Sequence, residues 1–411
     1  MDKNKNKNKN KNLKTHIVIA AGGTGGHIYP GLAVAKELIN RGYSVSWIGS
    51  EVGLEKKILS HLEDINKNIN LELDLLDISG VRNKGLKGWM NLPFKLMKAV
   101  WQARKILKKR QAELVISFGG FASGPAGLAI KLLGKKLFIH EQNAVLGLTN
   151  QYLSPWADQI FTAFEIKNFK NKKINLIGNP VRQEILDLRE RDFTPPLCPT
   201  GQGPVGLSLP QGERRNQIDR SFRILITGGS QGSEVFNKLI PEALFKITEH
   251  LSIHHQAGEK TIKMAEQSYQ EKMAQGLSQN MQHEVKLVSY FPEIAKEYAW
   301  ADLVICRAGA LSVYELALAG IPAIFIPHPG VVDDHQRKNA EWLSLKNINL
   351  CLIQADLNAE KLASEIKKLI NHPEILKTWK EKVYLETDNK KEAVRLLCDQ
   401  VDLLLFKPLS H

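Results

Sequence analysis

Apolar runs, glycine-rich turns and amphipathic segments of helical length alternate along this chain. The clearest instance is HIVIAAGGTGGHIYPGLAVAKEL, residues 16–38, where a β-branched apolar run meets four glycines and a helical pattern follows at once. Glycine lets a loop adopt positive φ and approach a ligand closely, and the unpaired N–H groups at the start of a helix favour an anion. The pattern predicts a strand, an anion-binding loop and a helix that ends before Gly42.

The same order of apolar run, glycine-rich turn and helical segment recurs at residues 113–133 and at residues 222–244. In the latter, Gly228 lies 206 positions (228 − 22) after Gly22. Further strands are predicted at residues 43–49, 159–164 and 173–178. Strands that alternate with helices favour a parallel sheet covered on both faces. We therefore predict an α/β protein with two Rossmann-like, doubly wound parallel-sheet domains.

Changes in composition divide the chain. We expect a disordered Lys/Asn tail at residues 1–13, an N-terminal domain at 14–182, a linker with a Pro/Gly-rich insertion at 183–221, a C-terminal domain at 222–372, and terminal helices at 373–411 that pack back on the body. The formal GxGxxG at Gly201, Gly203 and Gly206 lies in the insertion, with no strand before it and no helix after it. We treat that match as accidental.

Charge and cysteine content narrow the function classes. The formal net charge is +13, of which residues 1–14 contribute +5 through six Lys and one Asp. A basic body suits an anionic substrate or membrane surface, whereas nucleic acid is disfavoured because no recognition module accompanies the basic residues. The four cysteines show no CxxC spacing, which argues against a zinc site or disulfide framework and favours a cytoplasmic protein without a signal peptide or membrane-spanning helix.

No metal or cofactor is expected. The first loop has Ile28 where a dinucleotide fingerprint needs glycine, and no Gly-Lys-Ser/Thr follows it. Asp333, Asp334 and His335 cluster before a helix, but they have no further partners at ligand-like spacing, and the chain contains no Asp-x-Asp. Helix capping explains the aspartates better than metal binding.

Residues 93–110 are predicted to form an amphipathic helix with two apolar stripes. One stripe, assigned to the core, contains Leu96, Val100, Ala103 and Leu107. The other, assigned to an anionic membrane, contains Phe94, Met97 and Trp101 beside Lys95, Lys98 and Lys105. The alternative is an ordinary surface helix in which Trp101 is partly buried.

Polar residues follow apolar strands at two places where open α/β sheets bind ligands. The run His140, Glu141, Gln142, Asn143 ends one strand, and a site is favoured over a satisfied turn. Another strand ends at Arg307, and a helix then begins near Ala310. Two such halves, with glycine loops facing a common cleft, are typical of glycosyltransferases of the GT-B architecture.

Eight motifs identify a family. They are GGTGGHIYPGLAVA, ISGVRNKG, GGFASGPAG, HEQNAVLGLTN, GNPVR, TGGSQGSEVFN, CRAGALSVYELALAG and DDHQRKNA. In this order and spacing, over nearly the whole chain from Lys14, they resemble the MurG family of bacterial transferases. The resemblance implies transfer of N-acetylglucosamine (GlcNAc) from UDP-GlcNAc to undecaprenyl-pyrophosphoryl-MurNAc-pentapeptide (lipid I), which gives lipid II for peptidoglycan. It also implies a peripheral place on the cytoplasmic face of the inner membrane, where other cell-wall enzymes are potential partners.

The resemblance assigns roles to residues of this chain. The donor uracil would lie near Phe291, Ala310 and Leu311, the ribose at Glu315, the diphosphate at Ser230, Arg307 and Ser312, and the GlcNAc hydroxyls at Gln336 and His335. Thr24, Gly25, Gly26, Asn143 and Arg182 match positions that close on the donor, and Asn150 and Asn237 match further polar motif positions. Tyr314, where a smaller residue is common, would crowd the ribose.

An inverting transfer needs a base for the acceptor hydroxyl, and such a base contributes about 10²- to 10⁴-fold. His27 is the first candidate, followed by Glu141 and His140, although a neutral His27 could equally bind the acceptor diphosphate. Two other functions share the architecture: a UDP-GlcNAc 2-epimerase, which needs no lipid acceptor, and a non-enzymatic nucleotide-sugar sensor.

Overall fold

Each of the two glycine-loop halves of the sequence builds its own parallel β-sheet. The computed structural model describes residues 15–51, 53, 55–56, 71–78, 92–166, 173–192, 221–229, 232–274, 283–330, 334–390 and 392–405. Unit 1 comprises Met1–Arg182 and Glu392–His411, and unit 2 comprises Gln183–Lys391. The prediction of an α/β protein with two parallel sheets is confirmed.

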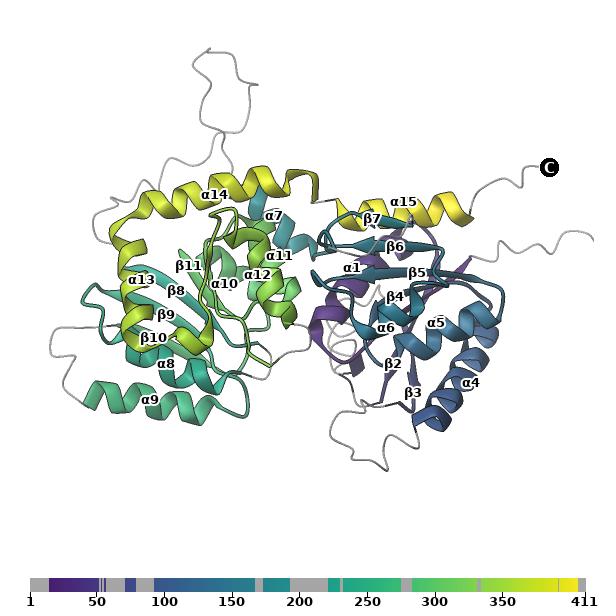
Figure 1. The fold of residues 1–411 in the computed structure, drawn as a ribbon, viewed down its shortest axis with the longest axis horizontal. Helices are drawn as coiled ribbons and strands as arrows, with labels where there is room; N and C mark the ends of the chain where they lie inside the picture. Colours follow the sequence, from purple (N-terminus) through teal and green to yellow (C-terminus); the bar gives the residue numbers. More distant parts are fainter. Residues whose placement is uncertain are drawn as a thin grey trace, which may run out of the picture. The chain divides into compact units, whose positions relative to one another are not determined.

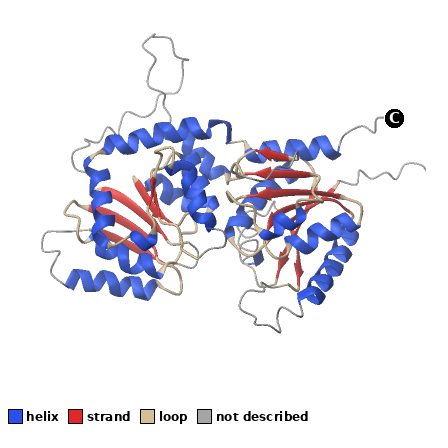
Figure 2. Ribbon diagram, in the orientation of Figure 1, coloured by secondary structure: helices blue, strands red, loops and turns tan. Residues whose placement is uncertain are grey.

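Unit 1 contains a seven-stranded sheet with the order β3-β2-β1-β4-β5-β6-β7, all neighbours being parallel. Its strands are β1 (His16–Ala21), β2 (Ser44–Ser50), β3 (Glu72–Leu76), β4 (Ala112–Gly119), β5 (Lys136–Glu141), β6 (Gln159–Thr162) and β7 (Ile174–Leu176). Its helices are α1 (Gly25–Asn40), α4 (Leu92–Arg110), α5 (Ser123–Leu132), α6 (Leu148–Leu153) and α15 (Ala393–Leu405). Helices cover both faces of the sheet (Figures 1 and 2). Strand order reverses between β1 and β4, so their carboxyl ends form the switch point at which such sheets bind ligands.

The side chains of β1 alternate between two apolar cores. Ile17 belongs to a fully buried cluster that includes Leu38 of α1 and Leu397 of α15. The next residue, Val18, belongs to a second buried cluster with Ala103 of α4. Successive side chains of a strand point to opposite faces, so a strand buried on both faces reads as a continuous apolar run. Each such aliphatic side chain stabilises the fold by roughly 1.5 to 3 kcal/mol.

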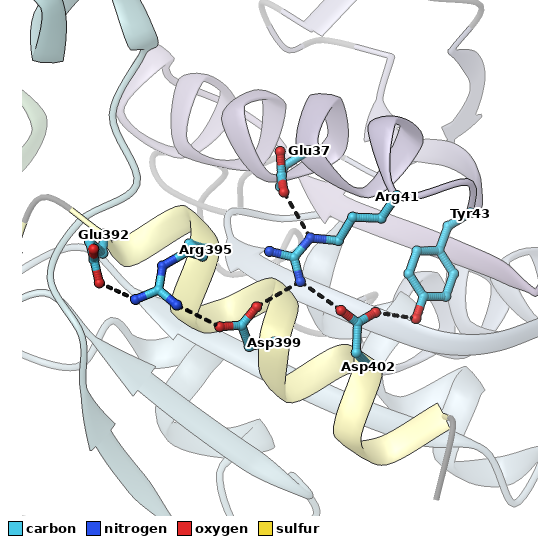
Figure 3. Close-up of polar contacts among 7 residues, drawn as sticks. All are labelled: Glu37, Arg41, Tyr43, Glu392, Arg395, Asp399 and Asp402. Atoms are coloured by element: carbon cyan, nitrogen blue, oxygen red, sulfur yellow. Dashed lines mark hydrogen bonds and ion pairs between the residues drawn. The ribbon is translucent and has the colours of Figure 1, made fainter.

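A network of ion pairs and hydrogen bonds connects α15 to the end of α1. The Nη1 atom of Arg41, the residue after α1, donates to Asp399 at 2.8 Å and to Asp402 at 2.6 Å, and the Tyr43 hydroxyl donates to Asp402 at 2.5 Å. Figure 3 shows the contacts of this network among the described residues Glu37, Arg41, Tyr43, Glu392, Arg395, Asp399 and Asp402. The network joins α1 to α15, which are the first and last helices of the part of the chain that the structure describes.

Unit 2 contains a six-stranded parallel sheet with the order β10-β9-β8-β11-β12-β13. Its strands are β8 (Phe222–Thr227), β9 (Leu251–Gln256), β10 (Glu284–Val288), β11 (Leu303–Cys306), β12 (Ala323–Phe325) and β13 (Leu350–Cys351). Its helices are α7 (Gln183–Asp192), α8 (Glu234–Leu244), α9 (Ile262–Ala274), α10 (Ile294–Trp300), α11 (Ala310–Ala319), α12 (His335–Ser344), α13 (Ala359–Asn371) and α14 (Pro373–Thr387), with 3₁₀ turns at Gln354–Asp356 and Asp388–Lys390. The switch point of this sheet lies between β8 and β11.

The two faces of β8 are also covered by separate cores. Ile224 belongs to a buried cluster with Ile240 of α8 and Leu362 of α13. Leu225 belongs to a cluster with Leu316 of α11. The sheet is therefore the central layer of unit 2 (Figure 2).

One segment differs from the sequence-based expectation. Residues 183–192, expected as the start of a linker, form α7, because Ile185 is fully buried in the cluster that contains Leu225. The helices within the terminal segment 373–411 pack on different units: α14 buries Val383 in a core of unit 2, and α15 buries Leu397 in a core of unit 1. The predicted tail and most of the Pro/Gly-rich insertion lie outside the described residues.

Candidate active site

The glycine loop between β1 and α1 is supported by a buried carboxylate. Glu55 is fully buried, and its Oε1 accepts hydrogen bonds from the backbone N–H groups of Gly23 at 3.3 Å and Ser50 at 3.0 Å. A Cβ added at Gly22 would lie 2.2 Å from the same oxygen. Gly22 is thus needed because Glu55 packs directly against it. The sequence pattern did not predict that Glu55 supports the glycine loop. The candidates Thr24, Gly25 and Gly26 follow as the N-cap and first two residues of α1.

His27 lies at the switch point of the unit 1 sheet, in the first turn of α1. Its Nδ1 lies 3.1 Å from the carbonyl oxygen of Gly22. A Cβ added at Gly119, the last residue of β4, would lie 3.4 Å from His27 Nε2, and Gly119 has a φ of 91°. Since Gly119 carries no side chain, the Nε2 edge of the imidazole is not blocked there.

Glu141 is fully occupied by hydrogen bonds within unit 1. Its side chain is 1% exposed. Oε1 accepts from the backbone and side-chain amides of Asn143, both at 3.0 Å, and Oε2 accepts from the N–H of Gly147 and from Asn150 Nδ2, both at 2.9 Å. These contacts fix the loop after β5. Asn143 and Asn150 therefore serve at least to shape this loop.

His140 is likewise enclosed. The side chain is fully buried, its Nε2 lies 3.0 Å from the carbonyl oxygen of Gly178, and Gln142 Nε2 lies 3.2 Å from its Nδ1. Burial lowers the pKa of His140 to about 4, although the Gly178 carbonyl acts in the opposite direction. The imidazole is neutral at pH 7, with both nitrogens engaged inside unit 1. Arg182 is half-buried, and its guanidinium lies 4.6 Å from the centre of the Tyr29 ring.

Unit 2 contains a cavity of about 580 Å³ at the carboxyl ends of β8 and β11. It is lined by Thr227, Gly228, Gly229, Gly232, Ser233, Glu234, Val235, Arg307, Gly309, Ser312, His328 and Gln336. The N-termini of α8 and α11 open toward it, which favours an anionic ligand. Three predicted donor-site residues, Arg307, Ser312 and Gln336, are brought together here.

The guanidinium of Arg307 makes most of its hydrogen bonds within the protein. It is 9% exposed; Nη1 donates to the carbonyl oxygen of Ile326 at 3.0 Å and to Gln354 Oε1 at 2.8 Å, and Nη2 donates to Ser233 Oγ at 2.8 Å. Burial lowers the pKa of Arg307 to about 10, so it stays charged at pH 7. Its guanidinium also lies 4.4 Å from the centre of the Phe236 ring. Arg307 thus joins the loops around the cavity and supplies a fixed positive charge.

Other predicted donor residues of unit 2 do not line this cavity. Phe291, Ala310 and Glu315 are buried, and Leu311 and His335 are half-buried. Ser230 lies outside the described residues. Asn237 is fully buried and donates through Nδ2 to the carbonyl oxygens of Ala257 and Thr261, which holds the turn before α9. The residues that line the cavity therefore do not include those predicted to bind the uracil and the ribose.

Four lining residues with polar side chains were not among the sequence-based candidates: Thr227, Ser233, Glu234 and His328. Ser233 caps α8 by accepting from the N–H of Phe236 at 3.3 Å. Ser233 and Glu234 belong to TGGSQGSEVFN, so their place after a glycine loop was the available signal. His328 follows β12 in IPHPG, and no motif marked it. Among the residues that the structure describes, no cluster of three or more His, Cys, Asp and Glu side chains could hold a metal ion.

Helix α4 presents an apolar, basic surface. Phe94, Met97 and Trp101 are 69%, 63% and 57% exposed. Lys105 Nζ lies 3.6 Å from the centre of the Trp101 ring, and Lys98 pairs with Asp77 at 2.8 Å.

The buried edge of α4 differs in part from the predicted stripe. Ala99, Ala103 and Leu107 form it, whereas Leu96, assigned to the core, is 37% exposed. The prediction for Leu96 is wrong because the first turns of α4 lie largely exposed and burial begins only at Ala99. No helix within the described ranges is long and apolar enough to span a bilayer.

Comparisons with known proteins place both halves in one family. The model of the glycosyltransferase family 28 N-terminal domain matches residues 17–162, and that of the glycosyltransferase family 28 C-terminal domain matches residues 223–397. A Psychromonas ingrahamii protein is 37% identical over 390 residues, which cover 94% of this chain and 99% of that protein. A Pseudomonas fluorescens protein is 38% identical over 364 residues, with 88% and 91% covered. Both are named UDP-N-acetylglucosamine--N-acetylmuramyl-(pentapeptide) pyrophosphoryl-undecaprenol N-acetylglucosamine transferase.

Solved structures agree with the sequence comparison. The crystal structure of Acinetobacter baumannii MurG matches with a TM-score of 0.70 and 32% identity, covering 94% of this chain and 99% of that one. A UDP-glucosyltransferase from Polygonum tinctorium matches with a TM-score of 0.64, covering 94% and 98%, but at 11% identity it shows the fold alone. The predicted GT-B architecture is confirmed by these neighbours. The chain is 37% identical to a relative over 94% of its length, and both glycosyltransferase family 28 domain models match it in order. It therefore belongs to the MurG family of glycosyltransferases.

Proposed function

We propose that this protein transfers GlcNAc from UDP-GlcNAc to the C4 hydroxyl of MurNAc in undecaprenyl-pyrophosphoryl-MurNAc-pentapeptide, which converts lipid I to lipid II. The observation that carries this proposal is the 37% identity over 94% of the chain to a transferase named for these substrates. The cavity of unit 2 supports it independently, because a glycine loop, two helix N-termini and a charged arginine form a site that suits a diphosphate.

The donor diphosphate is assigned to the cavity of unit 2. Ser312 in the first turn of α11 offers a hydroxyl, and backbone N–H groups of the loop around Gly229 offer further donors. Arg307 adds a positive charge that remains when UDP leaves. These groups stabilise the departing UDP without a metal. Gln336 is assigned to the GlcNAc hydroxyls, Glu315 and His335 to the ribose and sugar, and Phe291 with Leu311 to the uracil.

His27 is assigned as the general base. Its Nδ1 faces a carbonyl oxygen, which can only accept, so Nδ1 carries the proton and Nε2 holds a free lone pair. Nε2 takes the proton of the C4 hydroxyl while that oxygen attacks the anomeric carbon of GlcNAc, and the bond to UDP breaks on the opposite face. The configuration therefore inverts. Glu141 and His140 are less suited to this role because their hydrogen-bonding atoms are occupied inside unit 1.

A lipid-linked acceptor also requires contact with the membrane. We assign this contact to α4, where exposed Phe94, Met97 and Trp101 can enter the headgroup region while Lys95 and Lys105 approach anionic lipids. The protein would then act peripherally at the cytoplasmic face of the inner membrane. Binding to other cell-wall enzymes remains a prediction of the family resemblance.

The test is transfer of labelled GlcNAc from UDP-GlcNAc to the lipid acceptor, in detergent and with excess chelator. We expect labelled lipid-linked disaccharide and an equal amount of UDP. Ser312→Ala should raise the KM for UDP-GlcNAc more than it lowers kcat, since it removes a binding contact to the diphosphate. Glu315→Ala should likewise act mainly on donor affinity.

Two other outcomes would contradict the transferase. Release of UDP-ManNAc without acceptor would identify a 2-epimerase. Binding of UDP-GlcNAc by the folded protein without any product would identify a sensor.

A further inference from the structure

His328 lines the donor cavity together with Arg307 and Gln336, and neither the motifs nor the family assignment gives it a role. It lies three residues after Phe325, the last residue of β12, and it is exposed. Its backbone N–H donates to Gln336 Oε1 at 2.8 Å. This bond fixes the backbone of the loop, while the imidazole has no hydrogen-bond partner among the residues that the structure describes.

Arg307 cannot supply all the hydrogen bonds that a diphosphate would accept in this cavity. Its Nη1 is directed at Ile326, Pro327 and Gln354, and its Nη2 at Ser233. The guanidinium therefore supplies charge to the cavity but has few N–H groups left to hold phosphate oxygens. An imidazole on the same loop can supply a hydrogen bond that Arg307 cannot.

The charges around His328 decide its protonation. Partial burial, together with the positive charge of Arg307, lowers the pKa of His328, so the imidazole is mainly neutral at pH 7 without ligand. Among the residues that the structure describes, Glu234 in the first turn of α8 is the other titratable side chain that lines the cavity besides Arg307, and Asp334 and His335 begin α12 just before the lining residue Gln336. A bound diphosphate adds two negative charges, which oppose the effect of Arg307 and favour the imidazolium.

We propose that His328 is a phosphate-binding residue of the donor site and takes up a proton from solvent when the diphosphate of UDP-GlcNAc binds. This inference rests on the proposed function. The protonated Nε2–H or Nδ1–H then donates to a phosphate oxygen, a charge-assisted bond that is stronger than a neutral one. The same imidazolium remains to stabilise UDP after transfer.

Calorimetry of UDP-GlcNAc binding without acceptor tests the proposal. UDP-GlcNAc is the right probe because its diphosphate, unlike that of UDP, does not titrate near neutral pH. At pH 7.5, binding enthalpies in buffers of different ionisation enthalpy give the number of protons taken up. We expect a clear uptake, up to about one proton, in the wild type and close to none in His328→Gln, which keeps the backbone N–H to Gln336.

The pH dependence of affinity provides a second readout. A proton taken up on binding weakens affinity as pH rises, by up to about tenfold per pH unit. The Kd of the wild type should therefore rise between pH 6.5 and 8, and that of His328→Gln should change less. The exposed His372 of unit 2 is the matched control, and His372→Gln should retain the wild-type proton uptake and pH slope.

Three results would overturn the inference. Equal proton uptake in His328→Gln and wild type would show that another group titrates, and loss of uptake in His335→Gln alone would identify that histidine instead. In both cases lipid II synthesis by the wild type would leave the transferase assignment intact. Failure of the folded wild type to bind UDP-GlcNAc would overturn the proposed function together with this inference.

Discussion

His27 Nδ1, in the first turn of α1, lies 3.1 Å from the carbonyl oxygen of Gly22, five residues earlier in the glycine loop. The glycine loop therefore sets the tautomer of the imidazole as well as its place at the end of β1. Because a carbonyl cannot donate, the arrangement leaves Nε2 as the basic nitrogen.

Replacing His27 by Ala should lower kcat for lipid II synthesis by about 10²- to 10⁴-fold, because the acceptor hydroxyl loses its base. The KM for UDP-GlcNAc should change little. Steady-state kinetics with labelled donor measures both constants. The matched variant Glu141→Gln should act mainly on stability; if it lowered kcat as strongly as His27→Ala while remaining folded, the base would have to be reassigned.

Substitution in the network of Figure 3 should destabilise unit 1 without touching the cavity of unit 2. Arg41 and Asp402 are 19% and 37% exposed, so solvent screens the pair, and we expect a coupling energy of about 1 kcal/mol. A double-mutant cycle of Arg41→Ala and Asp402→Ala, followed by urea unfolding, measures it. The pair Lys98 and Asp77 is the control: both side chains are at least 60% exposed, and their coupling should be smaller.

The buried His140 should make unit 1 sensitive to acid. Its pKa is about 4 in the folded protein because of burial and near 6.5 in an unfolded chain. Between these values the unfolded state binds the extra proton, so the free energy of unfolding falls as pH falls, by up to about 1.4 kcal/mol per pH unit from this group. Above pH 6.5 the contribution is complete.

Urea unfolding of His140→Gln at several values between pH 4 and 7 checks this expectation. The variant should be less stable at pH 7 but show a shallower decline toward pH 4. His372→Gln, which removes an exposed imidazole, should keep the wild-type slope. Parallel curves for wild type and His140→Gln would mean that His140 is not the group that titrates.

The exposed apolar residues of α4 should contribute to membrane binding and little to stability. Trp101→Ser combined with Met97→Ser should change the free energy of unfolding by about 0.5 kcal/mol or less, as for other surface substitutions. Sedimentation with vesicles that contain anionic lipid should show weaker binding. Leu385→Ser, at a still more exposed position on α14, is the control and should leave vesicle binding unchanged. Equal loss in the control would point to a general effect of surface hydrophobicity.

Local sequence patterns predicted the strand, loop and helix units because each unit depends on neighbours in the chain. The glycine loop before α1 and the one before α8 follow directly from apolar runs and glycine spacing. The buried carboxylate of Glu55 could not be predicted in the same way. Its contact with Gly23, 32 residues earlier in the chain, arises only when β2 lies beside β1 in the folded sheet.

The candidate site, too, could be predicted from the sequence only in part. Motif spacing brought Arg307, Ser312 and Gln336 into the list of donor residues, and the three do line one cavity. Sequence could not show that most of the Arg307 guanidinium is directed at protein carbonyls and side chains. Nor did it mark His328, whose place in the cavity depends on the path of the loop after β12.

The return of α15 to unit 1 sets an order for folding during synthesis. Arg41 is separated from Asp399 by 358 positions, and Leu38 shares a core with Leu397. At about 5 to 20 residues per second, the ribosome makes the partner of α1 roughly 20 to 70 s after α1 itself. The first domain to leave the ribosome is thus the last that can be completed, and until then the apolar surface that α15 will cover is open to chaperones and proteases.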